Sequence, residues 1–307
     1  MNLSNVIRQH WAALRALLVL TVIVGIGYPL FIWLVAHIPG LSDKADGSII
    51  DLNGRPVASR LIGQQFTDAK GNALPQYFQS RPSAAGAGYD PMASGASNLG
   101  PESVVDTLGD PSEPAGGNGY AASLLTQVCT RSKDIGDANG VDGSRPFCTP
   151  GGVGAVLAVM GPRDARGTVV TPTRVISVNE PCTTTPSPFI ATYEGVRVEC
   201  AKFGEDYSAG QIVPIRGSAP SNPTVPADAV SASGSGLDPD ISPAYAAMQV
   251  ARVAKARGVD AREIGQLVTQ FSDGRAAGFF GEPAVNVVEL NLALDQKFPP
   301  KSSGQPG

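Results

Sequence analysis

The residues of this chain that could do chemistry are few, and the most suggestive form the segment SASGSGLDPDISP, residues 231–243. A glycine-rich loop with free N–H groups before a helix can bind phosphate. No Gly-Lys-Ser/Thr follows, which excludes a P-loop, and the aspartate spacing excludes an EF-hand. Asp238 and Asp240 would repel phosphate, and the Ser-Gly block holds no Lys or Arg. An ordered turn is therefore favoured over a strong phosphate site.

Cysteines are the other reactive residues, and there are four: Cys129, Cys148, Cys182 and Cys200. No CxxC pair is present and both histidines lie far from them in sequence, so no metal site is predicted. An even number of cysteines outside the cytoplasm indicates two disulfides, with four free buried thiols as the alternative. The most local of three connectivities pairs Cys129 with Cys148 and Cys182 with Cys200.

No nucleophile stands beside a base in the sequence, so no catalytic residue is predicted and the chain is not expected to be an enzyme by itself. The net charge of −4 over 307 residues excludes a nucleic-acid partner, which would need a basic face. Gly and Pro make up about a fifth of the chain, with 36 and 26 residues, which predicts long loops.

An apolar stretch at residues 16–38 is the clearest element in the sequence. A helix of this length spans roughly 34 Å, enough to cross a bilayer. A signal peptide would have a shorter apolar core and a small-x-small cleavage site, so a retained anchor is predicted. Gly25, Gly27 and Pro29 predict either a simple kink or a packing face against a larger membrane partner. Lys and Arg favour a cytoplasmic segment 1–15 and an extracytoplasmic bulk.

Three local patterns predict elements after the anchor. Asn53-Gly54 predicts a hairpin with strands near 48–52 and 56–62. Ser242 as N-cap, Pro243 at the first helical position and Gly258 as C′ bound a helix. A second helix follows with Asp260 as its N-cap, and the apolar run at 284–295 is interpreted as a strand, with a helix as the alternative.

Residues 103–228 change character. Short β-like runs alternate with turn residues, all four cysteines lie here, and Pro-rich linkers stand at both ends. This pattern predicts an inserted β-rich subdomain. The loop before it contains Tyr77, Phe78 and Tyr89 as apolar anchors, which predicts an ordered loop, and its Arg81 could bind an anion or pair with an acid of the same domain.

Several ordered blocks resemble the C subunit of the Kdp potassium-transporting P-type ATPase, the KdpC family. They include GIGYPL, GRPVASRLIGQQF, YFQSRPSA, YDPMASGASNLGP, SASGSGLDPDISPAYAAMQVARVAKARG and GEPAVNVVELNLALD. The region from about 103 to 228 lies outside the resemblance. The resemblance implies a nucleotide-binding role for Ser233, Gly234, Ser235, Gly236 and Gln249, with ATP as a possible ligand and no firmly bound cofactor.

The family also implies the partners: the potassium-conducting A subunit, the ATP-hydrolysing B subunit and the small F subunit. The expected function is that of a non-catalytic subunit that assembles and stabilises the complex; the family is described as a chaperone that raises the affinity of the B subunit for ATP. The alternative is an unrelated membrane-anchored extracytoplasmic binding protein.

The fold expected is a single N-terminal transmembrane helix plus an α+β extracytoplasmic domain with an inserted β-rich subdomain, in the cell membrane. The parts expected are a cytoplasmic N-terminus, the membrane helix, a soluble core in two pieces, the insert with its linkers, and a flexible tail, at residues 1–15, 16–38, 39–102 with 229–298, 103–228, and 299–307.

Overall fold

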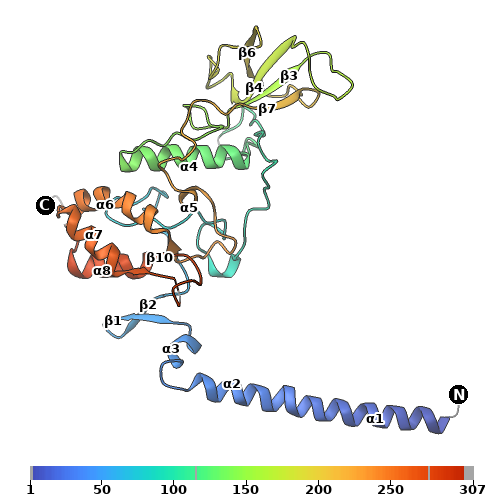
Figure 1. Cartoon of the computed structure of the whole chain (residues 1–307), viewed down its shortest axis with the longest axis vertical. Helices are drawn as coiled ribbons and strands as arrows, with labels where there is room; N and C mark the ends of the chain where they lie inside the picture. Colours follow the sequence, from blue (N-terminus) through green and yellow to red (C-terminus); the bar gives the residue numbers. More distant parts are fainter. Residues whose placement is uncertain (1–2, 115, 276, 301–307) are drawn as a thin grey trace. The chain divides into compact units, whose positions relative to one another are not determined.

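The computed structural model describes residues 3–114, 116–275 and 277–300 (Figure 1). The chain divides into two compact units, and the boundary between them in the sequence lies between Leu61 and Ile62. The predicted tail therefore lies outside the described residues from residue 301 on. Each unit is described by itself.

The first unit begins with one continuous helical segment, Leu3–Ala36, of 34 residues with no buried side chain. It is composed of α1 (Leu3–Val22), the π-helical turn η1 (Ile23–Gly27) and α2 (Tyr28–Ala36). Its length and apolar composition are sufficient to cross a membrane, and the described residues contain one helix of this kind.

The π-helical turn coincides with the two glycines of the membrane segment. The Tyr28 N–H bonds to the Ile23 carbonyl, five residues back instead of four. Pro29 follows directly, and its ring lacks an N–H and would collide with the carbonyl four residues earlier in a regular helix. The wider turn relieves this conflict, and the position is one where π-bulges often mark function.

After α2, the first unit contains α3 (Ser42–Ala45) and the hairpin formed by β1 (Ile49–Leu52) and β2 (Arg55–Ser59). Asn53 and Gly54 both have positive φ, 54° and 73°, as a type I′ turn requires. The predicted hairpin is confirmed.

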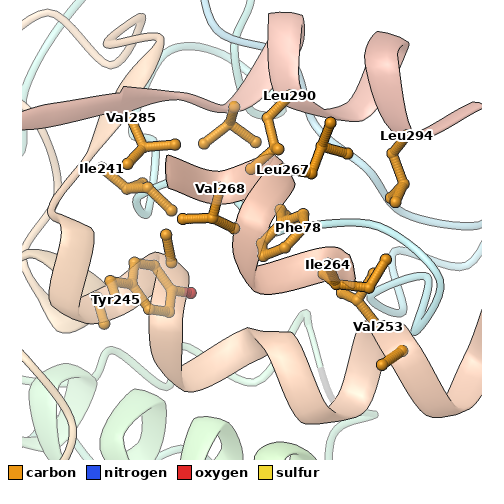
Figure 2. Close-up of a cluster of buried hydrophobic side chains, with 14 of the residues drawn as sticks. Phe78, Ile241, Tyr245, Val253, Ile264, Leu267, Val268, Val285, Leu290 and Leu294 are labelled. Atoms are coloured by element: carbon orange, nitrogen blue, oxygen red, sulfur yellow. The ribbon is translucent and has the colours of Figure 1, made fainter. Parts of the chain in front are cut away.

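The second unit has a helical core formed by α6 (Pro243–Arg257), α7 (Ala261–Gln270) and α8 (Val287–Lys297). A small antiparallel sheet borders it, with the order β8 (Asp240–Ile241), β10 (Ala284–Asn286), β9 (Ser272–Asp273). Phe78, from the long loop, inserts among the apolar side chains of these elements and is completely buried (Figure 2). The loop also contains the short helix η2 (Pro91–Ala93).

The strand predicted over 284–295 is wrong beyond Asn286, because residues from Val287 onward are helical. The Asn286 side chain accepts from the Glu289 N–H and caps the helix. Leu290 and Leu294 are both buried, and a spacing of four residues fits the period of a helix as well as that of a strand.

Residues 156–214 form a five-stranded sheet in the order β5-β6-β4-β3-β7. Its strands are β3 (Val156–Met160), β4 (Arg174–Pro181), β5 (Thr192–Tyr193), β6 (Val196–Ala201) and β7 (Gln211–Pro214). β4 and β6 are parallel and the other pairs are antiparallel. Apolar clusters cover both faces, so this sheet has its own cores.

The insert also contains a helix that the sequence interpretation missed, α4 (Leu124–Asn139). Ser123 caps its start and Gly140, with a φ of 67°, ends it. It precedes the strands of the sheet in the sequence, and it packs against α5 (Ala227–Val230) and α6 (Figure 1). Arg131 of α4 donates to the Val230 carbonyl at 3.0 Å. The β-rich description of 103–228 is therefore incomplete.

Candidate functional site

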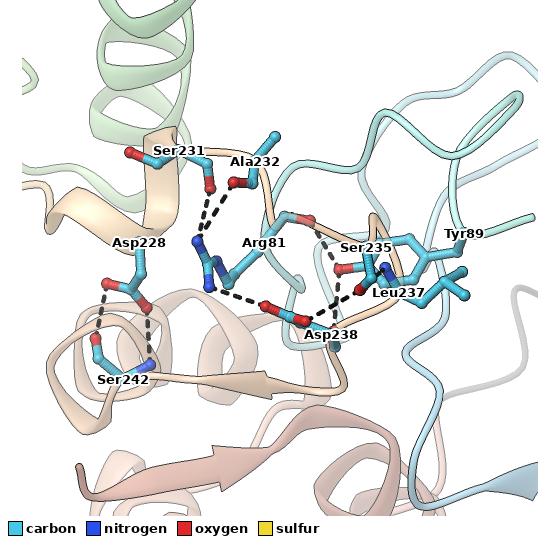
Figure 3. Close-up of polar contacts among 9 residues, drawn as sticks. All are labelled: Arg81, Tyr89, Asp228, Ser231, Ala232, Ser235, Leu237, Asp238 and Ser242. Carbon is cyan, nitrogen blue, oxygen red and sulfur yellow. Dashed lines mark hydrogen bonds and ion pairs between the residues drawn. The ribbon is translucent and has the colours of Figure 1, made fainter. Parts of the chain in front are cut away.

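The Ser-Gly loop, residues Ser233–Gly236, is an ordered turn whose backbone is bonded within its own unit (Figure 3). The Ser235 carbonyl accepts from the Gly95 N–H and the Ser94 hydroxyl, both at 2.9 Å. The Gly236 carbonyl accepts from the Ser83 hydroxyl at 2.6 Å. Gly236 has a φ of +70°, and a Cβ there would approach Ala85 to 2.7 Å, so a side chain is not tolerated.

Arg81 pairs with an acid of its own domain, one of its two predicted roles. Its guanidinium lies 3.0 Å from Asp238 and donates to the Ser231 carbonyl at 3.3 Å (Figure 3). The Tyr89 hydroxyl donates to the Arg81 carbonyl at 2.9 Å. Burial raises the pKa of Tyr89 to about 12, so the hydroxyl remains a donor at any physiological pH.

The N-terminus of α6 is occupied by a carboxylate from the chain itself. Ser242 is the N-cap, as predicted, and accepts from the Tyr245 N–H at 3.1 Å. Asp228, on α5, accepts from the Ser242 N–H at 2.7 Å and from its hydroxyl at 2.9 Å (Figure 3). Asp228 lies where a helix would attract an external phosphate. Sequence reasoning missed it, although the short segment ADAV precedes the helix by only 12 residues.

Gln249 is completely buried, and both ends of its amide are used. Its Oε1 accepts from the Gln79 N–H at 2.7 Å and from Arg252 at 2.6 Å, and its Nε2 donates to the Gln79 carbonyl at 3.1 Å. The side-chain amide therefore pairs with both backbone groups of Gln79, as a residue of a neighbouring β-strand would.

Asn291 of α8 bonds in the same way to the backbone of Phe78, the residue before Gln79. Its Oδ1 accepts from the Phe78 N–H at 2.9 Å and its Nδ2 donates to the Phe78 carbonyl at 2.9 Å. We call Gln249 and Asn291 the amide clamps. Together they satisfy the backbone of two consecutive loop residues, the buried Phe78 and the half-buried Gln79.

The residues implied in nucleotide binding thus face different neighbours. The Ser-Gly loop bonds to segment 82–95, whereas Gln249 bonds to Gln79 and Arg252. Among the hydrogen bonds of the described residues, none joins Gln249 to the Ser-Gly loop. Asp238, which follows the loop, is held by Arg81 and accepts from Ser235 at 3.3 Å.

The remaining predicted residues lie as follows. The structure contains both local disulfides, Cys129–Cys148 and Cys182–Cys200, with Cα–Cα distances of 5.4 and 5.0 Å. Gly25, Gly27 and Pro29 lie in and just after the π-helical turn. Within residues 3–114, 116–275 and 277–300, no cluster of three or more His, Cys, Asp or Glu could hold a metal ion.

One element of this site, α4, carries a sequence signal that the interpretation missed. Ser123, followed by apolar residues at helical spacing and by Gly140, has the start and stop signals of a helix. Arg252, which supports Gln249 and the loop carbonyls of Pro75 and Tyr77, has no signal of its own, because those two loop residues are 177 and 175 residues away.

Comparison with known proteins identifies a matching family profile, "K+-transporting ATPase, c chain", over residues 10–107 and 208–296. Similar proteins include the potassium-transporting ATPase KdpC subunit of Kineococcus radiotolerans, 34% identical over 97% of this chain and 98% of the relative. The KdpC subunits of Mycobacterium tuberculosis and Streptomyces avermitilis are 32% and 33% identical over 94% and 96% of this chain, and 98% and 96% of their own lengths.

Proposed function

This chain belongs to the KdpC family, the c chain of K+-transporting ATPases, and from this premise we propose that it is a non-catalytic subunit that assembles and stabilises its complex. The observation that carries the proposal is the burial of Gln249 with both ends of its amide bonded inside the fold. Membership of the family excludes the alternative of an unrelated binding protein.

The membrane helix supplies one assembly contact. Gly25 and Gly27 expose backbone on a helix that has no buried side chain of its own. Small residues allow two membrane helices to approach closely, and the backbone groups freed near Pro29 need partners in lipid. The proposed neighbour is the potassium-conducting A subunit, with the B and F subunits as further partners of the complex.

The second unit is proposed to lie outside the cytoplasm, with residues 1–15 inside, in the cell membrane. Two disulfides in this unit support an oxidising compartment. Protease added to intact spheroplasts should then remove the second unit, while residues 1–15 stay protected. Protection of the second unit until the cells are lysed would reverse this topology.

The family is described as raising the affinity of the B subunit for ATP. In our proposal this increase results from assembly of the complex. No nucleotide contact by the chain itself is needed, because the implied residues are engaged in the turn and the amide clamp. Titration of the full chain in detergent should give an ATP Kd weaker than millimolar. Tighter binding that Gln249→Ala abolishes, with the fold intact, would show that the chain is a nucleotide-binding subunit.

Assembly is tested by purification of the complex through a tag on the B subunit. The variant Gly25→Leu/Gly27→Leu should lower the recovery of this chain by about fivefold or more, since bulk would separate the packed helices. Val24→Leu is the matched control, because it adds an apolar group at a neighbouring position without removing a glycine. Equal recovery of all three chains would contradict the packing role.

A further inference from the structure

Two adjoining cavities lie between α4 and the helical core, with volumes of about 950 and 450 Å³. Residues of α4, α6 and the loop near Pro75 line the larger one. The two share Ala73, Gln79, Asp134, Ile135 and Tyr245, and we call them together the α4 groove. The larger volume is in the range of sites that hold small organic molecules.

Tyr245 gives the first sign that the α4 groove binds a ligand. Its side chain lies in the apolar core of Figure 2 and is only 3% exposed, yet the residue lines both cavities. A phenol hydroxyl can both donate and accept a hydrogen bond, so a tyrosine that lines both cavities can bind the polar group of a ligand there. Burial raises the pKa of Tyr245, which keeps this hydroxyl a donor.

Two arginines give the second sign. Arg131 and Arg252 line the α4 groove, one in each cavity, and neither has a carboxylate within ion-pair distance among the described residues. Arg131 donates only to the Val230 carbonyl and the Gln127 side chain, so donors of its guanidinium remain. Burial lowers the pKa of both groups. A partly desolvated cation without a counter-ion favours an anion beside it.

The Nε of Arg81 adds a third donor. Arg81 lines the smaller cavity, and its Nε is buried without a hydrogen-bond partner. The walls between these donors are apolar and small, with Ala73, Ala138 and Ala251 along the larger cavity. Asp134 and Asp137 also line that cavity and disfavour a ligand with several negative charges.

We propose that the α4 groove binds a small organic monoanion, with its acid group at Arg131 and Tyr245 and its apolar part along the alanine wall. α4 belongs to the insert, so the insert supplies one side of this site. The inference goes beyond the assembly function and does not depend on it. A nucleoside triphosphate does not fit, because its several charges would meet Asp134 and Asp137.

Three probes that share a phenylalkyl chain and differ in their head group test the proposal: 4-phenylbutyrate (an anion), 4-phenylbutanol (neutral) and 4-phenylbutylamine (a cation). Binding to the full chain in a non-ionic detergent is measured by calorimetry and by ligand-observed NMR. The butyrate should saturate one site with a Kd of about 0.1–1 mM, as expected for a ligand of this size. The alcohol and the amine should bind at least about tenfold more weakly, since they lack the charge that meets Arg131.

Variants locate the site. Ala138→Trp, at an exposed position, should abolish binding because the ring fills the larger cavity. Arg131→Gln should weaken phenylbutyrate about tenfold and Tyr245→Phe about fivefold, from the loss of one hydrogen bond each. Arg262→Gln removes an exposed cation elsewhere and should change nothing. Circular dichroism confirms that each variant is folded.

Several results would overturn the proposal: saturation by none of the probes up to 10 mM (roughly ten times the weakest expected Kd), equal binding of the amine, or binding that survives Ala138→Trp. Displacement of phenylbutyrate by ATP would also overturn it, because the site would then accept a polyanion.

Discussion

At two positions of the core, single side chains bond to backbone groups that a helix or a strand satisfies elsewhere in this protein. Gln249 and Asn291 each satisfy both backbone groups of one loop residue, so the loop is held inside the core without a strand. The same residue that the family resemblance implicates in nucleotide binding is therefore a structural clamp.

Replacement of Gln249 by Ala should lower the free energy of unfolding of the second unit by about 3 kcal/mol. The N–H and carbonyl of the half-buried Gln79 would both lose their partners, and an unpaired buried polar group costs roughly 1–3 kcal/mol. Urea unfolding followed by circular dichroism measures this. Gln266→Ala, on the exposed face of α7, is the control and should change stability by less than about 0.5 kcal/mol. Equal stability of the two variants would show that Gln249 is not a structural clamp.

Tyr89 should make stability depend on pH in the alkaline range. Its pKa is raised from 10.0 to about 12 in the fold, so the fold favours the protonated form. The stabilisation is complete below pH 10 and is lost as the pH rises toward 12, because the unfolded chain ionises first. Between pH 9 and pH 11, the wild type should lose about 1 kcal/mol more stability than Tyr89→Phe. Parallel pH profiles for the two proteins would contradict this assignment.

At the scale of elements, a glycine of α4 lets the chain that follows the helix pack closely against it. A Cβ on Gly136 would lie 2.6 Å from the backbone of Gly143, whereas a Cβ on Gly265 in α7 would meet nothing within 4 Å. Both glycines are inside helices, so the two positions differ mainly in packing.

The same substitution should therefore have opposite effects at the two positions. Gly136→Ala should destabilise by about 1–3 kcal/mol, because backbone must move. Gly265→Ala should stabilise by roughly 0.5–1 kcal/mol through helix propensity. Thermal unfolding compares them, with shifts of about 2–4 °C per kcal/mol expected for a unit of this size. A stabilising Gly136→Ala would show that α4 is not closely packed there.

Elements with local signals could be predicted from the sequence, and elements fixed by distant partners could not. Asn53-Gly54 and Ser242 with Gly258 act within a few residues. The hairpin has the predicted turn, although its second strand ends at Ser59 instead of residue 62, and α6 has the predicted bounds. The spacing of Leu290 and Leu294 fits a helix and a strand equally well, so it does not separate the two, and the cap at Asn286 is what begins α8. The loop residues that Gln249 and Arg252 contact lie about 170 residues away, beyond any local pattern.

At the scale of the whole molecule, the insert has its own cores and its own disulfide. The Cys182–Cys200 bond closes a loop of about 20 residues beside the parallel strands β4 and β6. The relatives match this chain over nearly their full lengths, while the family profile passes over residues 108–207. Residues 108–207, which make up most of the insert, are therefore aligned in these relatives and not matched by the family profile.

Removal of this disulfide should act on the sheet and spare the helical core. The variant Cys182→Ser/Cys200→Ser should lower the stability of the sheet by about 3 kcal/mol in the chain-entropy model. Hydrogen exchange should then speed up in β4 and β6, with protection of α6, α7 and α8 unchanged. Faster exchange in all of these elements would show that the insert and the core unfold as one unit.

The amide clamp at Phe78 can form only late in the synthesis of the chain. Its partner Asn291 is synthesised 213 residues later, which at 5–20 residues per second takes roughly 10–40 s. During this interval Phe78 leaves the ribosome with no core to enter, while every strand of the insert sheet, and both cysteine pairs, are completed before α6 appears. The nascent chain therefore has an unpacked apolar segment around Phe78 until α8 is synthesised. If the ribosome stalls before Asn291, this segment lacks its amide clamp.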